Sequence, residues 1–325
     1  MRSLWAILST GVLVTSALSA AHAAEVVGVG NFSHIVGNLE RAIEFYGDVL
    51  ELEPNVAATP FSANPAIMRL GNTPGAQSRI ATFRIPGSEL GVELIDYKDI
   101  DRHPVQLQFQ DPGATVLQLR VRDLDAVLAR VERSTGRIWT PTGEPILLGE
   151  ATRIIFIQDP DGFFIELIEV DAPGPGNVVG GTFELIIADS DESARFYREG
   201  LSVAPEVSAE FDDTKLLTDT VATPAAAFRR TVFTIPQTMV TMAFLEFKDI
   251  YRRPQQSRVQ DPGTPILQLF VDDVPGMTAQ LEAAGGTVIT EGGVVDLGGG
   301  RLVSIVRDPS NLFLELIPAL QEFRG

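Results

Sequence analysis

The chain has 325 residues, enough for about two domains of ordinary size. It contains no cysteine, which excludes disulfide bonds, thiolate metal sites and cysteine nucleophiles. Its 43 acidic and 25 basic residues give a net charge of −18, which argues against nucleic acid or an anionic membrane as a partner. Only three histidines are present, so chemistry based on imidazole has few candidates.

The N-terminal segment has the pattern of a secretory signal peptide. Arg2 supplies a positive charge, residues 4–18 are apolar apart from small polar residues, and Ala21-His22-Ala23 places small residues at the cleavage positions. We expect residues 1–23 to be removed and the mature protein to be periplasmic or secreted. A retained membrane anchor is the alternative, although the apolar run is short for a span of about 20 residues. We expect no integral membrane segment after cleavage.

Four segments of the mature chain share one order of predicted elements: an apolar strand, a turn with Asp or Asn, and an amphipathic helix. In chain order the apolar stripes of these helices begin at Leu39, Leu124, Ala194 and Val274. Extended stretches follow each helix, at residues 80–85, 91–97, 153–157, 163–170, 232–235, 239–247, 302–306 and 312–317.

The second half of the chain repeats the first after a shift of 150 residues. Lys98-Asp99-Ile100 then aligns with Lys248-Asp249-Ile250, and Gln110-Asp111-Pro112-Gly113 aligns with Gln260-Asp261-Pro262-Gly263. Agreement over so many positions indicates a tandem duplication. The same repeat contains Arg102 and Arg252, which we expect to pair with nearby carboxylates where one module meets the next.

The duplication predicts the domain organisation. Residues 173–180 are rich in Pro and Gly, which is typical of a linker. We therefore expect one domain over residues 24–172 and a second over residues 181–325, each with its own core.

Two kinds of motif suggest a family. Asn38–Tyr46 resembles the first helix of a glyoxalase-type module, and Asp159–Ile168 and Asp308–Ile317 resemble the closing turn and strand of the paired module. On these motifs the mature chain resembles the vicinal oxygen chelate superfamily, which includes glyoxalases, bleomycin resistance proteins and extradiol dioxygenases. The resemblance implies an α+β fold of four βαβββ modules, which form two glyoxalase-like cup-shaped domains.

The resemblance also implies where a metal would bind, on the first and last strands of each module. In this family the first-strand ligand, commonly His, usually stands seven residues before the Asp or Asn that starts the helix. Those positions are Asn31, Val116, Thr182 and Ile266, and the last-strand positions, usually Glu, are Glu93, Glu166, Ala243 and Glu315. Iron and zinc normally need imidazole as well as carboxylate, so we expect no metal and no other cofactor.

The two remaining histidines leave one alternative, a divalent metal in an atypical site. His34 lies three residues after Asn31, so strand alternation points it away from the cup, toward the helix. We expect a packed, hydrogen-bonded core histidine there, although a shift in strand register would turn it inward. His103 follows the last strand of the first module, where we expect a surface loop.

Strand alternation predicts the polar lining of each cup. The inward side chains expected in the first half are Asn31, Ser33, Glu93, Gln118, Arg120 and Glu166. Those expected in the second half are Thr182, Glu184, Gln268, Phe270 and Glu315. Gln118 and Gln268 occupy matching positions and either contact a ligand or bridge strands. Buried carboxyl groups beside apolar walls have raised pKa values and can move protons, unless Arg120 or backbone amides satisfy them.

Together these features predict an exported protein that binds an apolar or aromatic small molecule in one or both cups, without the usual metal. We expect the first half to be functional, with a polar centre of Glu166, Glu93, Gln118 and Asn31. The alternative is a lyase, isomerase or dioxygenase-like enzyme that uses Glu93 and Glu166 as an acid–base pair or as atypical metal ligands. A degenerate module used for association is a third possibility, and nothing in the sequence fixes the oligomeric state.

Overall fold

A computed structural model of the chain describes residues 23–149, 151–203, 205–213, 218, 220–223, 226–253 and 256–319. The proposed signal peptide lies outside the described residues except for its last residue, Ala23. Within the described ranges, no helix has the length and apolar character that a membrane span requires.

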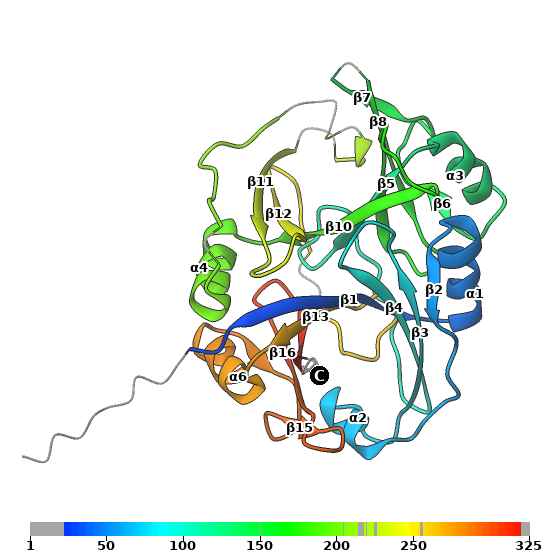
Figure 1. Ribbon diagram of the computed structural model, residues 1–325. Coiled ribbons are helices and arrows are strands. Elements are labelled where there is room, and N and C mark those ends of the chain that lie inside the picture. The colour runs from blue at the N-terminus through cyan, green and yellow to red at the C-terminus, as the bar shows by residue number, and fades with distance from the viewer. Residues whose placement is uncertain are drawn as a thin grey trace, which may run out of the picture.

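The chain passes four times through the predicted order of strand, helix and further strands (Figure 1). The first module contains β1 (Val26–Val36), α1 (Leu39–Glu44), a π-helical turn (Phe45–Val49), β2 (Glu53–Val56), α2 (Pro65–Leu70), β3 (Gln77–Arg84) and β4 (Gly91–Lys98). The second contains β5 (Thr115–Val121), α3 (Leu124–Val131), β6 (Arg137–Ile138), β7 (Ile146–Leu148), β8 (Thr152–Gln158) and β9 (Phe164–Glu169).

The second half follows the same plan. The third module contains β10 (Val178–Ile187), α4 (Ser190–Leu201), β11 (Ala227–Thr234) and β12 (Thr241–Lys248). The fourth contains β13 (Pro265–Val271), α6 (Val274–Ala283), β14 (Thr287–Val288), β15 (Val295–Asp296), β16 (Leu302–Arg307) and β17 (Phe313–Pro318). The predicted α+β architecture of four repeated modules is confirmed.

The turn residues that mark each helix in the sequence are its N-caps. Asn38 accepts a hydrogen bond from the amide of Arg41, and Asp189 accepts from the first turn of α4. Asp123 and Asp273 cap α3 and α6 in the same way. These short polar side chains satisfy amide groups that would otherwise lack partners, which explains why all four helices begin where the pattern predicts.

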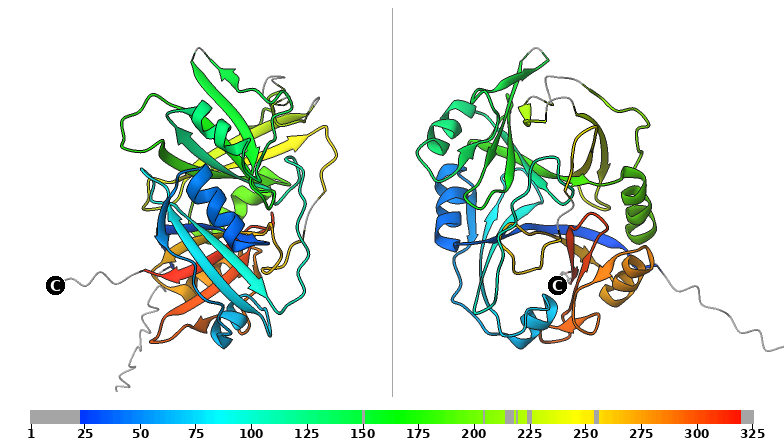
Figure 2. Two further views of the ribbon diagram at one scale, coloured as in Figure 1. Left: turned by 90° about the vertical axis from the view of Figure 1, so that its right-hand side faces the viewer. Right: turned by 180° about the vertical axis from the view of Figure 1, so that it is seen from behind.

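The modules pair across the two halves of the sequence. β1 pairs antiparallel with β13, so the first and fourth modules form one sheet, here called cup 1. β5 pairs antiparallel with β10, so the second and third modules form the other sheet, cup 2. Seen from behind in Figure 2, the green and yellow strands of cup 2 lie above the blue, cyan, orange and red strands of cup 1.

The expectation that each half would form its own cup is therefore wrong. All four first strands show the same inward and outward alternation, so the pattern does not specify which of them become neighbours. The long connections after β4 and β12 carry the chain from one sheet to the other. Each connection donates one backbone hydrogen bond to the other. The amide of His103 donates to Asp261 Oδ1 and the amide of Arg253 donates to Asp111 Oδ1, both at 2.8 Å.

The convex faces of both sheets share one continuous core with α1, α3, α4 and α6. Phe32 of β1 and Phe183 of β10 stack with ring centroids 4.9 Å apart, which joins the two sheets directly. In Figure 1 these helices form two pairs, with α1 and α3 on the right and α4 and α6 on the left, and α2 lies apart from both pairs at the bottom. The concave face of each cup is therefore available either for a ligand site or for packing by the side chains of the cup itself.

His34 lies on the convex face of β1, as predicted, and is fully buried. Its ring centroid lies 3.7 Å from that of Phe163, and neither ring nitrogen has a hydrogen-bond partner. The expected hydrogen bond is therefore absent from the described structure, and burial lowers the pKa of His34 to about 3. At the matching positions the other three modules have leucine, namely Leu119, Leu185 and Leu269.

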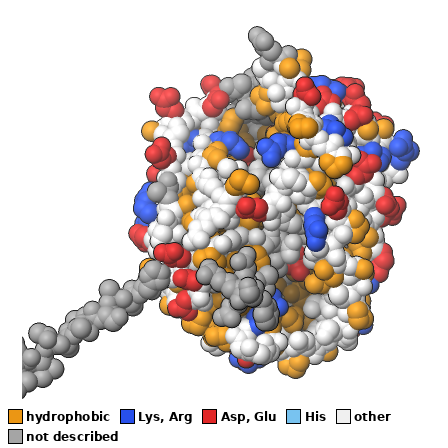
Figure 3. Space-filling model, in the orientation of Figure 1, with side chains coloured by type: hydrophobic (Ala, Val, Ile, Leu, Met, Phe, Trp, Pro, Cys, Tyr) orange, Lys and Arg blue, Asp and Glu red, His pale blue; other side chains and the backbone are white. Residues whose placement is uncertain are grey.

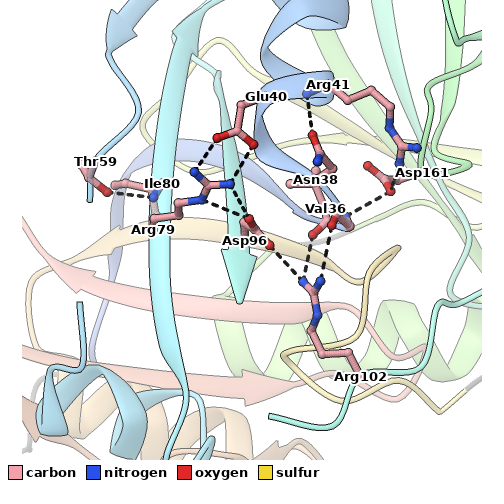
Figure 4. A network of polar contacts seen from close by, with 11 residues as sticks. Val36, Asn38, Glu40, Arg41, Thr59, Arg79, Ile80, Asp96, Arg102 and Asp161 are labelled. Atoms are coloured by element: carbon pink, nitrogen blue, oxygen red, sulfur yellow. Dashed lines mark hydrogen bonds and ion pairs between the residues drawn. The ribbon is translucent and has the colours of Figure 1, made fainter. Parts of the chain in front are cut away.

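A polar network ties α1 to the strands of the first module (Figure 4). The Arg79 guanidinium lies 2.6 Å from Glu40 and 2.9 Å from Asp96, and Arg102 lies 3.1 Å from Asp96. Arg102 thus pairs with a carboxylate, as expected. The same expectation is wrong for Arg252, which donates to two backbone carbonyl oxygens at the end of β10.

Candidate functional site

Four pairs of residues face each other across the first and last strands of the modules. The paired positions are Ser33 with Glu93, Gln118 with Glu166, Glu184 with Ala243, and Gln268 with Glu315. The first-strand members stand five residues before the helix cap. The expected positions, seven residues before it, therefore do not lie opposite the last-strand glutamates, and Val116 and Ile266 instead contribute to apolar clusters.

The crossed pairing of modules divides the predicted centre between two sites. Glu93 and Asn31 lie in cup 1, whereas Glu166 and Gln118 lie in cup 2. The predicted acid–base pair of Glu93 and Glu166 is therefore wrong. Ser33, Gln268 and Glu315 belong to cup 1, and Arg120 and Glu184 belong to cup 2.

The polar residues of cup 1 satisfy one another. Gln268 Nε2 donates to Glu93 Oε2 at 2.8 Å and to Glu315 Oε2 at 2.9 Å. Ser33 Oγ also donates to Glu93, and Asn31 Nδ2 donates to Gln268 Oε1. Burial, followed by the charge of Glu315, raises the pKa of Glu93 to about 7. A carboxyl pair bridged by one amide is thus the centre of cup 1.

On one side of this centre the concave face of cup 1 is filled by its own side chains, and on the other side Asn31, Gln268 and Phe270 line a depression of about 530 Å³. Leu70, at the end of α2, packs on the filled side with residues from six strands. The buried apolar residues of this cluster include Ile35, Ile95, Tyr97, Ile266, Val303, Ile305 and Phe313. Cup 1 is therefore packed on the side where cup 2 has its cavity-lining apolar residues.

Cup 2 contains a cavity of about 310 Å³. Its walls are mostly aromatic and aliphatic side chains, namely Phe109, Leu148, Phe156, Ile168, Val221, Phe228, Leu245 and Phe247. Its polar lining consists of Gln118, Glu166, Glu184, Thr218 and Arg230. Figure 3 shows a hollow with hydrophobic side chains in the upper half of this face, and acidic and basic side chains interspersed over the rest.

The polar end of the cavity is acidic and partly neutralised. Gln118 Nε2 donates to Glu166 Oε2 at 2.5 Å, and Arg230 Nε donates to Glu184 Oε1 at 2.8 Å. Burial is the main cause that raises the pKa of Glu166 to about 7, and the charge of Glu184 adds to it. The Arg230 side chain is 42% exposed and that of Glu184 only 6%, so the guanidinium covers the carboxylate from the solvent side.

Arg230 was not identified from the sequence, and Arg120 was expected to serve in its place. Arg120 instead lines a neighbouring depression of about 340 Å³, together with Thr182 and Met239. Strand alternation along β11 could have identified Arg230, because Phe228 and Arg230 are two residues apart and share the concave face.

The donor sets of the two cups do not fit iron or zinc. In cup 1 the amide nitrogen of Gln268 already bridges the two carboxyl groups, and in cup 2 Arg230 neutralises Glu184 opposite Ala243. His34 faces the core, and His103 lies 65% exposed beside Asp101. In the part of the chain that the structure describes, no three His, Asp or Glu residues form a group suited to a metal ion.

Repeated βαβββ modules with polar-lined concave sheets define the class of protein. The family model of the Glyoxalase/Bleomycin resistance protein/Dioxygenase superfamily matches residues 28–167 and 181–316, and the chain belongs to this superfamily. The resemblance inferred from the helix and turn motifs is confirmed.

Solved structures with the same fold include a glyoxalase I and a dioxygenase-like protein. Glyoxalase I from Zea mays is 16% identical with a TM-score of 0.58, over 91% of this chain and 92% of that chain. A mutant of the same enzyme gives 17% and 0.59, over 91% and 94%. A putative dioxygenase from Bacillus subtilis subsp. subtilis str. 168 is 15% identical with a TM-score of 0.56, over 90% and 86%. These likenesses show the fold alone, and no curated protein sequence matches the chain.

Proposed function

We propose that the protein is an exported small-molecule-binding protein whose site is the cavity of cup 2. The observation that carries this proposal is an apolar cavity of about 310 Å³ with a polar group of residues at one end. Cavities of about 300–1,000 Å³ with apolar walls and a few oriented polar groups are typical ligand sites. The aromatic walls favour an apolar or aromatic ligand.

In this proposal cup 1 has a structural role. Its polar residues are satisfied internally and the concave face around Leu70 is packed, so a ligand in that part of the cup would have to displace both. The proposed site works without the usual metal of the family, because neither donor set suits iron or zinc. The proposed export, to the periplasm or beyond, rests on Arg2, the apolar run and Ala21-His22-Ala23.

A second candidate function is acid–base catalysis in the same cavity. Glu166 is a buried carboxyl group in the cavity wall, and its pKa is raised to about 7. A carboxyl group poised near neutral pH accepts and returns a proton efficiently. The reaction would then be that of a lyase or isomerase that removes one proton from a bound substrate.

Binding of a neutral apolar fluorophore, N-phenyl-1-naphthylamine, tests the proposed site. We expect its fluorescence to rise when it binds the purified protein. Its affinity should fall by at least about tenfold with Leu245→Trp, which fills the cavity. Glu315→Gln, in cup 1, is the control and should bind as the unaltered protein does. Equal binding by Leu245→Trp would place the site elsewhere, and no binding by the unaltered protein would contradict the proposed function.

A further inference from the structure

We infer that the cavity of cup 2 selects ligands that combine an apolar body with a protonated amine. This inference rests on the proposed function and names the ligand class of the same site. It follows from the hydrogen bonds left open at the polar end, from the charges there, and from the difference between the two cups.

The open hydrogen-bonding capacity of the two cavity carboxyl groups is acceptor capacity. Gln118 uses its Nε2 amide group on one oxygen of Glu166, and Arg230 directs Nε and Nη2, but not Nη1, to one oxygen of Glu184. No hydrogen bond from the described residues reaches the second oxygen of either carboxyl group. A ligand that satisfies these oxygens must therefore donate hydrogen bonds, and an ammonium group has three donors and no acceptor.

The charges favour a cation over an anion. Among the residues that the structure describes, two buried carboxyl groups face the cavity, and the one guanidinium that neutralises them is 42% exposed to solvent. A ligand carboxylate would meet both glutamates in a poorly solvated site, where repulsion is strong. An ammonium group would instead balance Glu166, and the ring faces of the four cavity phenylalanines add a weaker attraction for a cation.

Cup 1 supplies an internal comparison. There the two carboxyl groups are bridged by the amide nitrogen of Gln268, at 2.8 Å and 2.9 Å. In cup 2 the matching amide of Gln118 reaches Glu166 alone, so Glu166 and Glu184 have no shared donor among the described residues. The ammonium group of the ligand would take the bridging role that Gln268 has in cup 1.

A matched series of three probes tests the inference: 4-phenylbutylamine, 4-phenylbutan-1-ol and 4-phenylbutyrate. Titration calorimetry at pH 8, with the full mature chain, should give the amine at least about tenfold tighter binding than the alcohol, as expected for a charge-assisted hydrogen bond, with the carboxylate weakest. Glu166→Gln should reduce the advantage of the amine over the alcohol to less than about threefold and leave the alcohol bound. Glu315→Gln, the cup 1 control, should keep the full advantage.

Several outcomes would overturn the inference. If the carboxylate binds as tightly as the amine, or if Glu166→Gln leaves the ratio of amine to alcohol unchanged, the ligand class is wrong. If only the alcohol binds, the proposed function stands and this inference fails. If none of the three probes binds, both fail. Should Glu166→Gln not fold by circular dichroism, Glu184→Gln provides the same test from the other carboxyl group.

Discussion

At the scale of single residues, His34 stands out because the other three modules have leucine at its position. A fully buried imidazole without a hydrogen bond is held neutral, and its pKa falls from about 6.5 to about 3. Below pH 6.5 the unfolded chain binds a proton that the native chain does not. His34 therefore costs the protein progressively more stability as the pH falls from 6.5 toward 3.

Replacing His34 by leucine should stabilise the protein, and more so in acid. We expect His34→Leu to add about 2 kcal/mol more to the free energy of unfolding at pH 5 than at pH 8. Urea unfolding at the two pH values measures the difference. His103→Leu, at a surface position, controls for the loss of one imidazole. A gain that is the same at both pH values would show that His34 is not held neutral.

The contribution of Glu93 to stability changes with pH in the opposite direction to that of His34. Its pKa in the native protein is raised from about 4.5 to about 7, chiefly by burial, so the native chain keeps a proton that the unfolded chain loses. The contribution of this group to stability is complete below pH 4.5 and declines as the pH rises through 7. Glu93→Gln should remove that decline and stabilise the protein at pH 8, relative to pH 4.5, by about 1–3 kcal/mol.

Chemical unfolding of Glu93→Gln across this pH range gives the measurement, with Glu89→Gln as a surface control. An unchanged slope of stability against pH would mean that Glu93 is ionised in the native state. The amide of Gln268 would then be holding two carboxylates rather than a carboxyl–carboxylate pair.

At the scale of elements, the sequence was sufficient for what depends on local pattern. Strand alternation placed Gln118, Glu166 and Gln268 on concave faces, and the capping residues gave the start of each helix. It was not sufficient for the grouping of these residues. Whether Glu166 meets Glu93 or Glu184 depends on which first strands pair, and the repeated modules have too similar a pattern to specify that.

The crossed pairing depends on the long connections between cups, and Asp261 is central to one of them. It accepts a hydrogen bond from the amide of His103 and pairs with Arg258. We expect Asp261→Ala to lower the free energy of unfolding by about 1–3 kcal/mol, because the His103 amide then loses its partner. Asp101→Ala removes an exposed partner of the same Arg258 and should cost less than about 1 kcal/mol. Equal losses would show that the connection contributes little.

At the scale of the whole molecule, the two halves of the sequence depend on each other. Each cup contains one module from each half, and the stacked Phe32 and Phe183 join the cups across their convex faces. A single half would expose the inner edge of β1 and the inner edge of β5, whose partners β13 and β10 lie in the other half. Such unpaired edges favour association with a second chain.

This interdependence predicts the behaviour of residues 24–174 expressed alone. Because β1 and β5 lose the partners that cover them, the fragment should not form a stable monomer. It should either aggregate or form a dimer in which β1 of one chain pairs with β5 of the other, since the repeated modules present the same alternation to a partner. Light scattering with denaturant unfolding distinguishes these outcomes.

A monomer that unfolds cooperatively would mean that one half can close its own cup, as the repeat in the sequence first suggested. The crossed arrangement would then be one of two pairings available to the chain. Adding residues 175–325 as a separate chain is the matched control, and recovery of a one-to-one complex would show that the cups assemble across the halves.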